Sequence, residues 1–345
     1  MSGGVDSSVA AVLTQNAGLT CIGATMLLCN RLVPQKEQDP VEDAKAVADR
    51  LGMDFYVLDA QNDFEDKVVR PFISAYENGL TPNPCITCNQ HLKFDFFLNY
   101  ALKMGCDYVV TGHYARICRD ETTGRYLLKK AVDHNKDQSY FLACLNQHQL
   151  SHSRFPLGEL TKEQARDIAQ EQGLITAKKK DSQDICFIPD GNYVNFMTRY
   201  TGKAYPQGAF LDLEGNKIGT HNGAVCYTAG QRKGLGLAMG TPVYVCAKDM
   251  AANTVTVGPE SALYATTLYA QNWNWFPFPD LTEPMEVMAK ARYRHIPQPA
   301  TVYPDENGNA RVVFHEPQRA LTPGQSVVLY QDDLVIGGGI ITQIK

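Results

Sequence analysis

The chain has 345 residues and a formal net charge of −5, and its composition is ordinary for a globular protein. The length suggests two or three domains, and the acidic balance argues against a broadly basic nucleic-acid-binding protein, although local basic patches still allow phosphate contacts. Every apolar run is shorter than the ~18 residues that span a membrane, and no signal peptide is visible, so we expect a cytoplasmic protein without a membrane partner.

The first part of the sequence alternates helical and strand patterns. Strand patterns are short apolar runs, whereas helical patterns repeat apolar residues at three- and four-residue spacing. Such alternation predicts an α/β fold with a doubly wound parallel sheet, whose ligands bind at the carboxyl ends of the strands. The predicted elements are a helix with its first turns at 9–13, a strand over 19–28, a helix over 40–51, a strand over 55–59, a helix over 92–104 and a strand over 107–111.

The later part of the sequence changes character. A capping box at Thr161 and Gln164 predicts a helix that ends near Gly173, and beyond about residue 200 short strand patterns alternate with turn residues. Two small β-rich domains, folded as barrels or sheets, fit this part of the chain. The predicted strands cover 224–227, 243–247, 254–257, 285–294, 310–314, 326–330 and 334–341.

A glycine-rich loop opens the chain, with the sequence Ser2-Gly3-Gly4-Val5-Asp6-Ser7-Ser8. Its two glycines permit a tight turn and close backbone approach to a ligand. Because the following helix N-terminus presents unpaired N–H groups and a positive dipole end, the loop predicts an anion site. It lacks the lysine of a G-x-x-x-x-G-K-[ST] loop, so it is not that phosphate loop. Gly112 and His113 follow a predicted strand and are expected at the same sheet edge as the opening loop. One site can therefore contain both segments.

Three of the ten cysteines stand in informative positions. Cys85 and Cys88 form a C-x-x-C on a stiff loop that has proline on both sides of Asn83, and Cys186 follows a polar, lysine-rich run. The pair is typical of a redox dithiol or half a metal site, and two unrelated core cysteines are the other option. We expect the remaining cysteines to be small buried hydrophobes, namely Cys21, Cys29, Cys106, Cys118, Cys144, Cys226 and Cys246.

Seven sequence motifs occur along the chain in an order that is highly specific. They are S-G-G-V-D-S-S (2–8), T-P-N-P-C-x-x-C-N (81–89), V-T-G-H-Y-A-R (110–116), K-D-Q-S-Y-F-L (136–142), D-S-Q-D-I-C-F-I (181–188), Y-T-A-G-Q-R-K-G-L-G-L (227–237) and L-T-P-G-Q-S-V-V-L-Y (321–330). On these motifs the chain resembles the bacterial tRNA-specific 2-thiouridylase family, within the PP-loop ATP pyrophosphatases, over essentially its whole length. In that superfamily a hydrophobic strand precedes S-G-G, and we expect this first strand to be missing here.

The resemblance implies three domains. These are a doubly wound parallel-sheet PP-loop domain that binds ATP and carries catalysis over 1–200, a small β-rich central domain over 201–263, and a C-terminal β-barrel-like domain over 264–345.

The resemblance also implies ATP-dependent 2-thiolation of the wobble uridine in tRNAs for Lys, Glu and Gln. ATP adenylates the 2-carbonyl oxygen, because AMP is the better leaving group, and a protein persulfide then delivers sulfur to the ring carbon. By motif match Cys186 carries the persulfide and Cys88 is the nucleophile paired with it, so that a Cys88–Cys186 disulfide remains for an external reductant. A cysteine desulfurase or a sulfur carrier would donate the persulfide sulfur.

Several alternatives stay open. Cys85 stands where one form of the family has Asp, and its role is undetermined. Cys85, Cys88 and Cys186 could instead hold an Fe–S cluster with one open iron. Mg²⁺ is expected with ATP, because pyrophosphate needs charge neutralisation. Two other functions also remain: a PP-loop enzyme with a different acceptor, and an inactive, truncated tRNA-binding form.

Charge patterning indicates some binding residues, and the resemblance implies others. Lys178 to Lys180, Arg232-Lys233 and Arg292 to His295 are basic clusters for phosphate contacts or solvated surface. Tyr293 offers stacking beside charge, as recognition of a splayed-out loop base requires. The implied ATP-binding residues are Ser2, Gly3, Gly4, Asp6, Ser7, Met26 and Gly112. The implied tRNA-binding residues are Asn83, Pro84 and Cys85 at the target base, with His113, Lys136, Asp137, Gln138, Arg292, Tyr293 and Gln325 near the anticodon.

Overall fold

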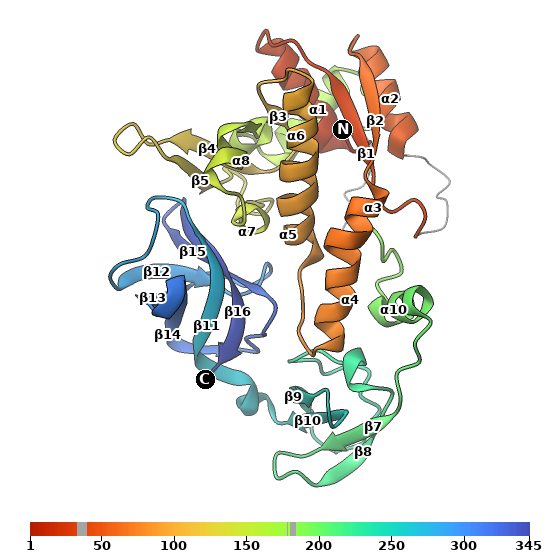
Figure 1. The fold of residues 1–345 in the computed structure, drawn as a ribbon, viewed down its shortest axis with the longest axis vertical. Coiled ribbons are helices and arrows are strands. Elements are labelled where there is room, and N and C mark those ends of the chain that lie inside the picture. The colour runs from red at the N-terminus through yellow and green to blue at the C-terminus, as the bar shows by residue number, and fades with distance from the viewer. Residues whose placement is uncertain (33–39, 178, 180–183) are drawn as a thin grey trace.

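The structure is a computed structural model that describes residues 1–32, 40–177, 179 and 184–345. Figure 1 shows three parts in chain order: an α/β part that carries the N-terminus, a small central sheet and a C-terminal β-barrel. Lys178 and Lys180 of a predicted basic cluster, and Asp181, Ser182 and Gln183 of the motif that leads to Cys186, lie outside the described residues.

The α/β part contains two pairs of parallel strands, in agreement with the predicted fold class. β1 (Gly23–Leu27) pairs with β2 (Phe55–Asp59), and β3 (Val109–Val110) pairs with β6 (Ser153–Arg154). The strand predicted over 19–28 is too long, because its strand pairing begins only at Gly23, opposite Phe55, and Leu19 is 53% exposed.

Helices and a β-hairpin accompany these strands (Figure 1). Helix α1 already begins at Val5, directly after the glycines, so the opening loop lies at its N-terminus as predicted. The remaining elements of this part are α2 (Pro40–Arg50), α3 (Gln61–Phe64), the π-helical η1 (Glu65–Val69), α4 (Arg70–Glu77), β4 (Ala115–Arg119), β5 (Tyr126–Lys130), α7 (Ser139–Leu142), α8 (Gln147–Ser151), η3 (Pro156–Glu159), α9 (Lys162–Glu171) and α10 (Tyr193–Thr201), with α1 covering Val5–Asn16.

One long helix carries the C-x-x-C motif. It is continuous through α5 (Pro84–Cys88), the π-helical η2 (Asn89–Phe96) and α6 (Phe97–Lys103). The helix predicted over 92–104 therefore begins earlier, because the Asn83 side chain caps it by accepting the Cys85 N–H at 3.2 Å and Pro84 occupies the first turn. π-Helical turns are frequent at functional sites.

The predicted capping box is confirmed. Thr161 Oγ1 accepts the Gln164 N–H at 3.2 Å, and Gln164 Oε1 accepts the Thr161 N–H at 2.8 Å. Gly173 follows the helix with φ +59°, in agreement with the predicted end. The cap fixes the start of α9, and Lys162 therefore stands in its first turn.

The central part is a four-stranded sheet in the order β8-β7-β10-β9. The strand predicted over 224–227 is wrong. Gly223 turns the chain at φ +101°, and the Cys226 N–H bonds to the Gly223 carbonyl at 3.0 Å, which forms the 3-10 turn η4 instead. The elements are β7 (Gly208–Leu211), β8 (Lys217–His221), η4 (Ala224–Cys226), β9 (Tyr244–Asp249) and β10 (Thr254–Gly258).

The C-terminal part is a closed barrel, because β11 pairs with both β14 and β16. The predicted strand over 285–294 is too long, since β12 ends at Lys290. The elements are η5 (Glu260–Leu263), β11 (Tyr264–Trp275), β12 (Met285–Lys290), β13 (Gln298–Pro304), η6 (Glu306–Gly308), β14 (Ala310–Arg319), β15 (Ser326–Gln331) and β16 (Leu334–Ile344).

The barrel and the α/β part share a sheet and an apolar core. Leu334 of β16 pairs with Lys129 of β5, so the β4–β5 hairpin extends the barrel sheet. One buried cluster combines Phe94 and Leu128 of the α/β part with Phe276 of the barrel. No helix in the described part of the chain is long and apolar enough to cross a membrane.

Candidate functional site

The opening loop has the geometry of an anion site. Gly3 adopts φ +67°, and a Cβ there would lie 2.5 Å from the Pro40 carbonyl oxygen, so the position requires glycine. No side chain in the described ranges caps the N-terminus of α1 at Gly4. Ser7 closes the loop by accepting the Ser2 N–H at 3.1 Å and donating to the Gly4 carbonyl at 3.1 Å. The N–H groups at the start of α1 are therefore available to an anion.

Gly112 lies directly against this loop. A Cβ on Gly112 would lie 2.5 Å from the Asp6 carbonyl carbon and 2.7 Å from the Ser7 nitrogen. The predicted juxtaposition of the opening loop with the end of the strand is therefore confirmed, and it depends on the missing side chain of Gly112.

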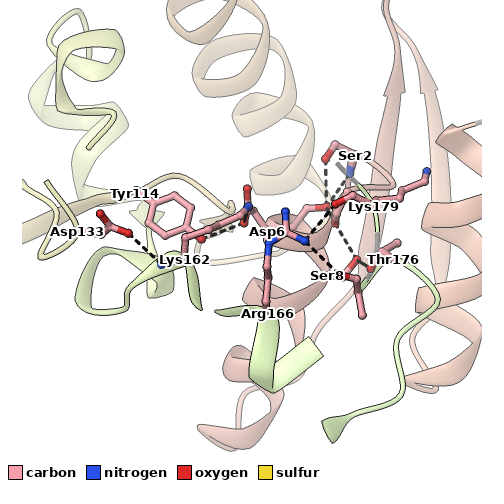
Figure 2. Close-up of polar contacts among 12 residues, drawn as sticks. Ser2, Asp6, Ser8, Tyr114, Asp133, Lys162, Arg166, Thr176 and Lys179 are labelled. Carbon is pink, nitrogen blue, oxygen red and sulfur yellow. Dashed lines mark hydrogen bonds and ion pairs between the residues drawn. The ribbon is translucent and has the colours of Figure 1, made fainter. Parts of the chain in front are cut away.

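Asp6 is held by two polar side chains from other elements (Figure 2). Its Oδ1 accepts the Tyr114 hydroxyl at 3.0 Å and the Lys162 ammonium at 2.6 Å. Lys162 is 8% exposed, and its backbone N–H bonds to Asp133 at 3.0 Å. This arrangement fits a carboxylate that orients the loop. The sequence motifs missed Lys162, although the capping box placed it at the start of a helix.

A second lysine reaches the loop from the segment after α9. Lys179 donates to the Gly3 carbonyl at 3.0 Å and pairs with the Asp43 carboxylate, and nearby Thr176 donates to Ser8 Oγ at 3.1 Å (Figure 2). Lys179 therefore contacts the opening loop. The alternative that its basic cluster is solvated surface does not hold for this residue.

One cavity of about 2640 Å³ joins the loop to the thiols. Its wall contains the glycine loop together with Cys85, Cys88 and Cys186. All predicted ATP-binding and tRNA-binding residues line it except Asn83, Asp137, Arg292 and Gln325.

The three thiols differ in exposure. Cys88 is 8% exposed, and burial raises the pKa of its thiol to about 12. Cys85 and Cys186 are exposed on the cavity wall. Desolvation by the surrounding protein raises the pKa of Cys85. The pKa of Cys186 is strongly raised, first by a hydrogen bond with the Cys29 thiol and second by desolvation. All three sites favour the neutral thiol, so a nearby cation is important for thiolate chemistry.

Lys93 provides that cation. It lies in the π-helical segment η2 and lines the cavity, and its charge lowers the pKa of Cys85, Cys88 and Cys186 against the effect of burial. Lys93 lies outside the seven sequence motifs and was not predicted as a site residue. Its place five residues after Cys88 on one helix was the available signal.

The expectation that the other seven cysteines are small buried hydrophobes is wrong in their burial, although Cys29, Cys144, Cys226 and Cys246 pack against apolar clusters. Each is partly exposed. Cys29 lies two residues beyond the end of β1, at the carboxyl edge of the strand, and its Sγ lies 3.8 Å from the Cys186 carbonyl oxygen. All ten cysteines belong to the described residues, and none forms a disulfide there.

Two inorganic groups are expected at this site, an Fe–S cluster and Mg²⁺. Within the described ranges, no three or more His, Cys, Asp or Glu side chains are grouped to hold a metal ion. Cys85, Cys88 and Cys186 therefore do not fit an Fe–S cluster in this arrangement. For Mg²⁺ the loop offers one carboxylate, Asp6, whose Oδ1 already accepts the Tyr114 hydroxyl and the Lys162 ammonium.

Several residues expected at the tRNA serve internal bonds. Asp137 accepts the Ser139 hydroxyl at 2.8 Å and the Ala131 N–H at 3.0 Å. Gln325 donates to the Thr81 carbonyl at 2.8 Å, which attaches the barrel to the loop before the C-x-x-C helix. Gln138 accepts the N–H of Tyr114 at 3.0 Å.

Arg292 and Tyr293 lie at the junction with the barrel. Arg292 donates to the Ala320 carbonyl at 2.6 Å and to the Ala229 carbonyl at 3.3 Å, so it joins the central part to the barrel. The Tyr293 ring centroid lies 4.2 Å from that of Phe141, and Tyr293 lines the cavity together with Lys136.

His113 is a neutral side chain of the cavity wall. Burial, followed by the charge of Lys93, lowers the pKa of His113 well below its usual value. Its Nε2 lies 3.5 Å from Lys93 Nζ and its Nδ1 lies 2.8 Å from Thr111 Oγ1. Because Lys93 is a donor only, Nε2 accepts and Nδ1 carries the proton.

A glycine loop at a helix N-terminus in an α/β part, followed by two β modules, defines a three-module HUP-type protein. Family models match accordingly: the tRNA methyl transferase HUP domain over residues 1–190, the tRNA methyl transferase PRC-barrel domain over 194–259, and the aminomethyltransferase beta-barrel domain over 265–341. The chain belongs to the tRNA-specific 2-thiouridylase family, MnmA.

Relatives named tRNA-specific 2-thiouridylase MnmA match the chain over nearly its full length. The protein of Clostridioides difficile is 46% identical, covering 99% of this chain and 96% of the relative. Those of Acetivibrio thermocellus and Clostridium acetobutylicum are 48% and 47% identical, covering 99% of this chain and 97% and 98% of the relatives.

Proposed function

We propose that this chain is a tRNA-uridine 2-sulfurtransferase, which uses ATP to replace the 2-carbonyl oxygen of the wobble uridine in tRNAs for Lys, Glu and Gln with sulfur. The observation that carries the proposal is a single cavity whose wall contains both a helix N-terminal anion loop and the thiols of Cys85, Cys88 and Cys186. Adenylation and sulfur transfer act on the same ring position, and one cavity allows both. The names of the relatives agree with this activity.

The loop side of the cavity suits adenylation. The uridine 2-oxygen attacks the α-phosphorus of ATP, and pyrophosphate leaves. Backbone N–H groups at the start of α1 would meet phosphate oxygens, and Lys162 and Lys179 bring positive charge to the same loop. We assign ATP contacts to Ser2, Gly3, Gly4, Asp6, Ser7, Met26 and Gly112, all of which line the cavity.

The thiol side suits sulfur transfer. The terminal sulfur of a Cys186 persulfide attacks ring carbon 2, and AMP leaves with the original oxygen. The Cys88 thiolate then attacks Cys186 Sγ, breaks the sulfur–sulfur bond and releases the thiolated base. A Cys88–Cys186 disulfide remains, and an external dithiol reduces it. Lys93 favours the thiolate at each of these positions.

The cavity wall also suits a base removed from its stack. Cys85, neutral His113 and Tyr293 line it, and Lys136 and Arg294 add charge for the RNA backbone. We assign tRNA contacts to the predicted set, with Asn83, Asp137, Arg292 and Gln325 acting through the loops that they hold. A cysteine desulfurase or sulfur carrier would load Cys186.

The test is nucleoside mass spectrometry of unmodified tRNA(Glu) after incubation with the protein, ATP, Mg²⁺ and a persulfide donor. We expect 2-thiouridine with an equivalent amount of AMP. Cys88→Ser and Cys186→Ser should abolish thiolation while tRNA binding is retained, and Cys246→Ser on β9, outside the cavity, should not. Full activity in either cavity variant would contradict the persulfide route.

A further inference from the structure

Cys186 touches a thiol that the proposed reaction does not use. Cys29 Sγ lies 3.8 Å from the Cys186 carbonyl oxygen, and the two side chains are hydrogen-bonded. The charge of Cys186 raises the pKa of Cys85 and Cys88, whereas Cys29 affects the pKa of Cys186 through a hydrogen bond, so Cys29 is a thiol in direct contact with Cys186.

Both cysteines stand on short turns with buried anchors. The Leu32 N–H bonds to the Cys29 carbonyl at 2.9 Å, and the Ile188 N–H bonds to the Ile185 carbonyl at 2.9 Å across Cys186. Phe187, next to Cys186, is 1% exposed and belongs to the same apolar cluster as Cys88, against which Cys29 also packs. Cys29, Cys88 and Cys186 are therefore arranged around one apolar core.

Access to the three sulfurs differs. Cys88 is 8% exposed, Cys29 is partly exposed and Cys186 is exposed. The proposed reaction ends with a disulfide that has one sulfur at the buried Cys88 position. An external dithiol that attacks the exposed Cys186 sulfur of this disulfide must expel the buried Cys88 thiolate, whereas in a Cys29–Cys186 disulfide both sulfurs are at least partly exposed. The rate of exchange depends on which sulfur is attacked and on access to it.

We propose that Cys29 is a relay thiol, which moves the product disulfide from the Cys88–Cys186 pair to an accessible Cys29–Cys186 pair before an external dithiol reduces it. This inference rests on the proposed function, because it takes the Cys88–Cys186 disulfide as its substrate.

The exchange is balanced without any oxidant or reductant. The Cys29 thiolate attacks Cys186 Sγ, a Cys29–Cys186 bond forms, and the Cys88–Cys186 bond breaks. Cys88 leaves with the electron pair of that bond and takes up the proton that Cys29 gave up. Lys93, whose charge favours the Cys88 thiolate, stabilises this leaving group.

The first test is peptide mapping of disulfides after turnover without reductant, with free thiols alkylated. Wild-type protein should accumulate the Cys29–Cys186 peptide. Cys29→Ser should stop at Cys88–Cys186, keep its first turnover, and require roughly tenfold more dithiol for half-maximal multiple-turnover rate. Cys246→Ser is the matched control. Only Cys88–Cys186 in the wild type, with unchanged dithiol dependence in Cys29→Ser, would overturn the relay.

The second test does not need turnover. A Cys88→Ser variant is oxidised with diamide and mapped in the same way. We expect a Cys29–Cys186 cross-link, which requires Cα atoms within about 4.4–6.8 Å of one another. Cross-linking of Cys186 to Cys85 instead would contradict the pairing. Thiolation that persists in Cys186→Ser would overturn the persulfide route of the proposed function and the relay with it, whereas the first two contrary results remove the relay alone.

Discussion

Lys93 is one side chain whose positive charge lowers the pKa of all three thiols of the site. Its ammonium opposes the burial that raises the pKa of Cys85 and Cys88, and it also lowers the pKa of Cys186. It lies in the π-helical segment of the helix that carries the C-x-x-C, so the backbone irregularity and the charge coincide.

Replacing this charge tests its role. Lys93→Met should raise the thiol pKa values by roughly one unit and slow iodoacetamide alkylation of Cys186 about tenfold at neutral pH, because fewer thiolates are present. Lys93→Arg, which keeps the charge, is the control and should retain most of the rate. Equal alkylation rates in wild type and Lys93→Met would contradict this account.

Lys248 on β9 carries a pH-dependent cost of folding. Its Nζ is buried without a hydrogen-bond partner among the described residues, and burial lowers its pKa from 10.5 to about 8. Between these pH values the unfolded chain binds more protons than the folded one, so stability contributed by this residue rises with pH.

Lys248→Met should raise the free energy of unfolding by about 1–3 kcal/mol at pH 7, since it removes an unsatisfied buried amine. The gain should shrink as pH rises from about 8 to 10.5, the window in which the amine has lost its proton in the folded state but keeps it in the unfolded chain. Urea denaturation across pH measures this. A gain that is constant with pH, or equal to that of the exposed control Lys217→Met, would be the contrary result.

At the scale of single residues, the sequence predicts contacts that are made within a local motif. The capping box of Thr161 and Gln164 follows from residue order alone, as does the lack of a side chain at Gly112 that its contact with the loop requires. Lys93 could have been assigned, because it follows Cys88 by five residues on one helix. Cys29 and Lys162 could not, because their partners come from distant positions in the chain: Cys186 and Asp6. Spacing in sequence carries no information on such contacts.

At the scale of elements, the turn into α1 depends on Gly3 in two ways. Gly3 has a positive φ, and a side chain there would also meet Pro40 of α2. Gly18 is a matched control, because it too has a positive φ, +79°, but no atom lies within 4 Å of its Cβ position.

Gly18→Ala should therefore cost about 1–2 kcal/mol of stability, the price of the left-handed backbone. Gly3→Ala should cost about 1–3 kcal/mol more through crowding, and should weaken binding of a non-hydrolysable ATP analogue at least about tenfold. Thermal unfolding and calorimetric titration measure the two effects. Equal stability and equal affinity in the two variants would show that the loop does not need this close approach.

Elements with a strong local signal were predictable, and those that need a partner were not. The capping box of α9 fixes its start from four residues. The strand over 19–28 was overextended, because pairing with β2, rather than apolarity, decides where β1 begins. The segment 224–227 is apolar like a strand, yet the positive φ of Gly223 turns it into η4.

At the scale of the whole molecule, the barrel and the α/β part share one core. Phe276 is fully buried in a cluster with Phe94 and Leu128, and Arg125 donates to the Phe276 carbonyl at 2.7 Å. Both tryptophans, Trp273 and Trp275, lie in β11 of the barrel, whereas most helices lie in the α/β part.

We therefore expect barrel and α/β part to unfold together. Tryptophan fluorescence and circular dichroism at the helix band should give coincident transitions in wild type. Phe276→Ala should lower both midpoints equally, at a cost of about 3–5 kcal/mol. A fluorescence transition that shifts alone would show that the shared core does not couple the two parts.

The most direct test of the central claim is a single-turnover reaction with the protein persulfidated on Cys186, tRNA(Glu), ATP and Mg²⁺. AMP and 2-thiouridine are measured from the same quench. The account predicts one 2-thiouridine and one AMP per Cys186 persulfide consumed, with neither formed by Cys186→Ser. AMP without 2-thiouridine, or 2-thiouridine that does not consume the Cys186 persulfide, would contradict adenylation and sulfur transfer within one cavity.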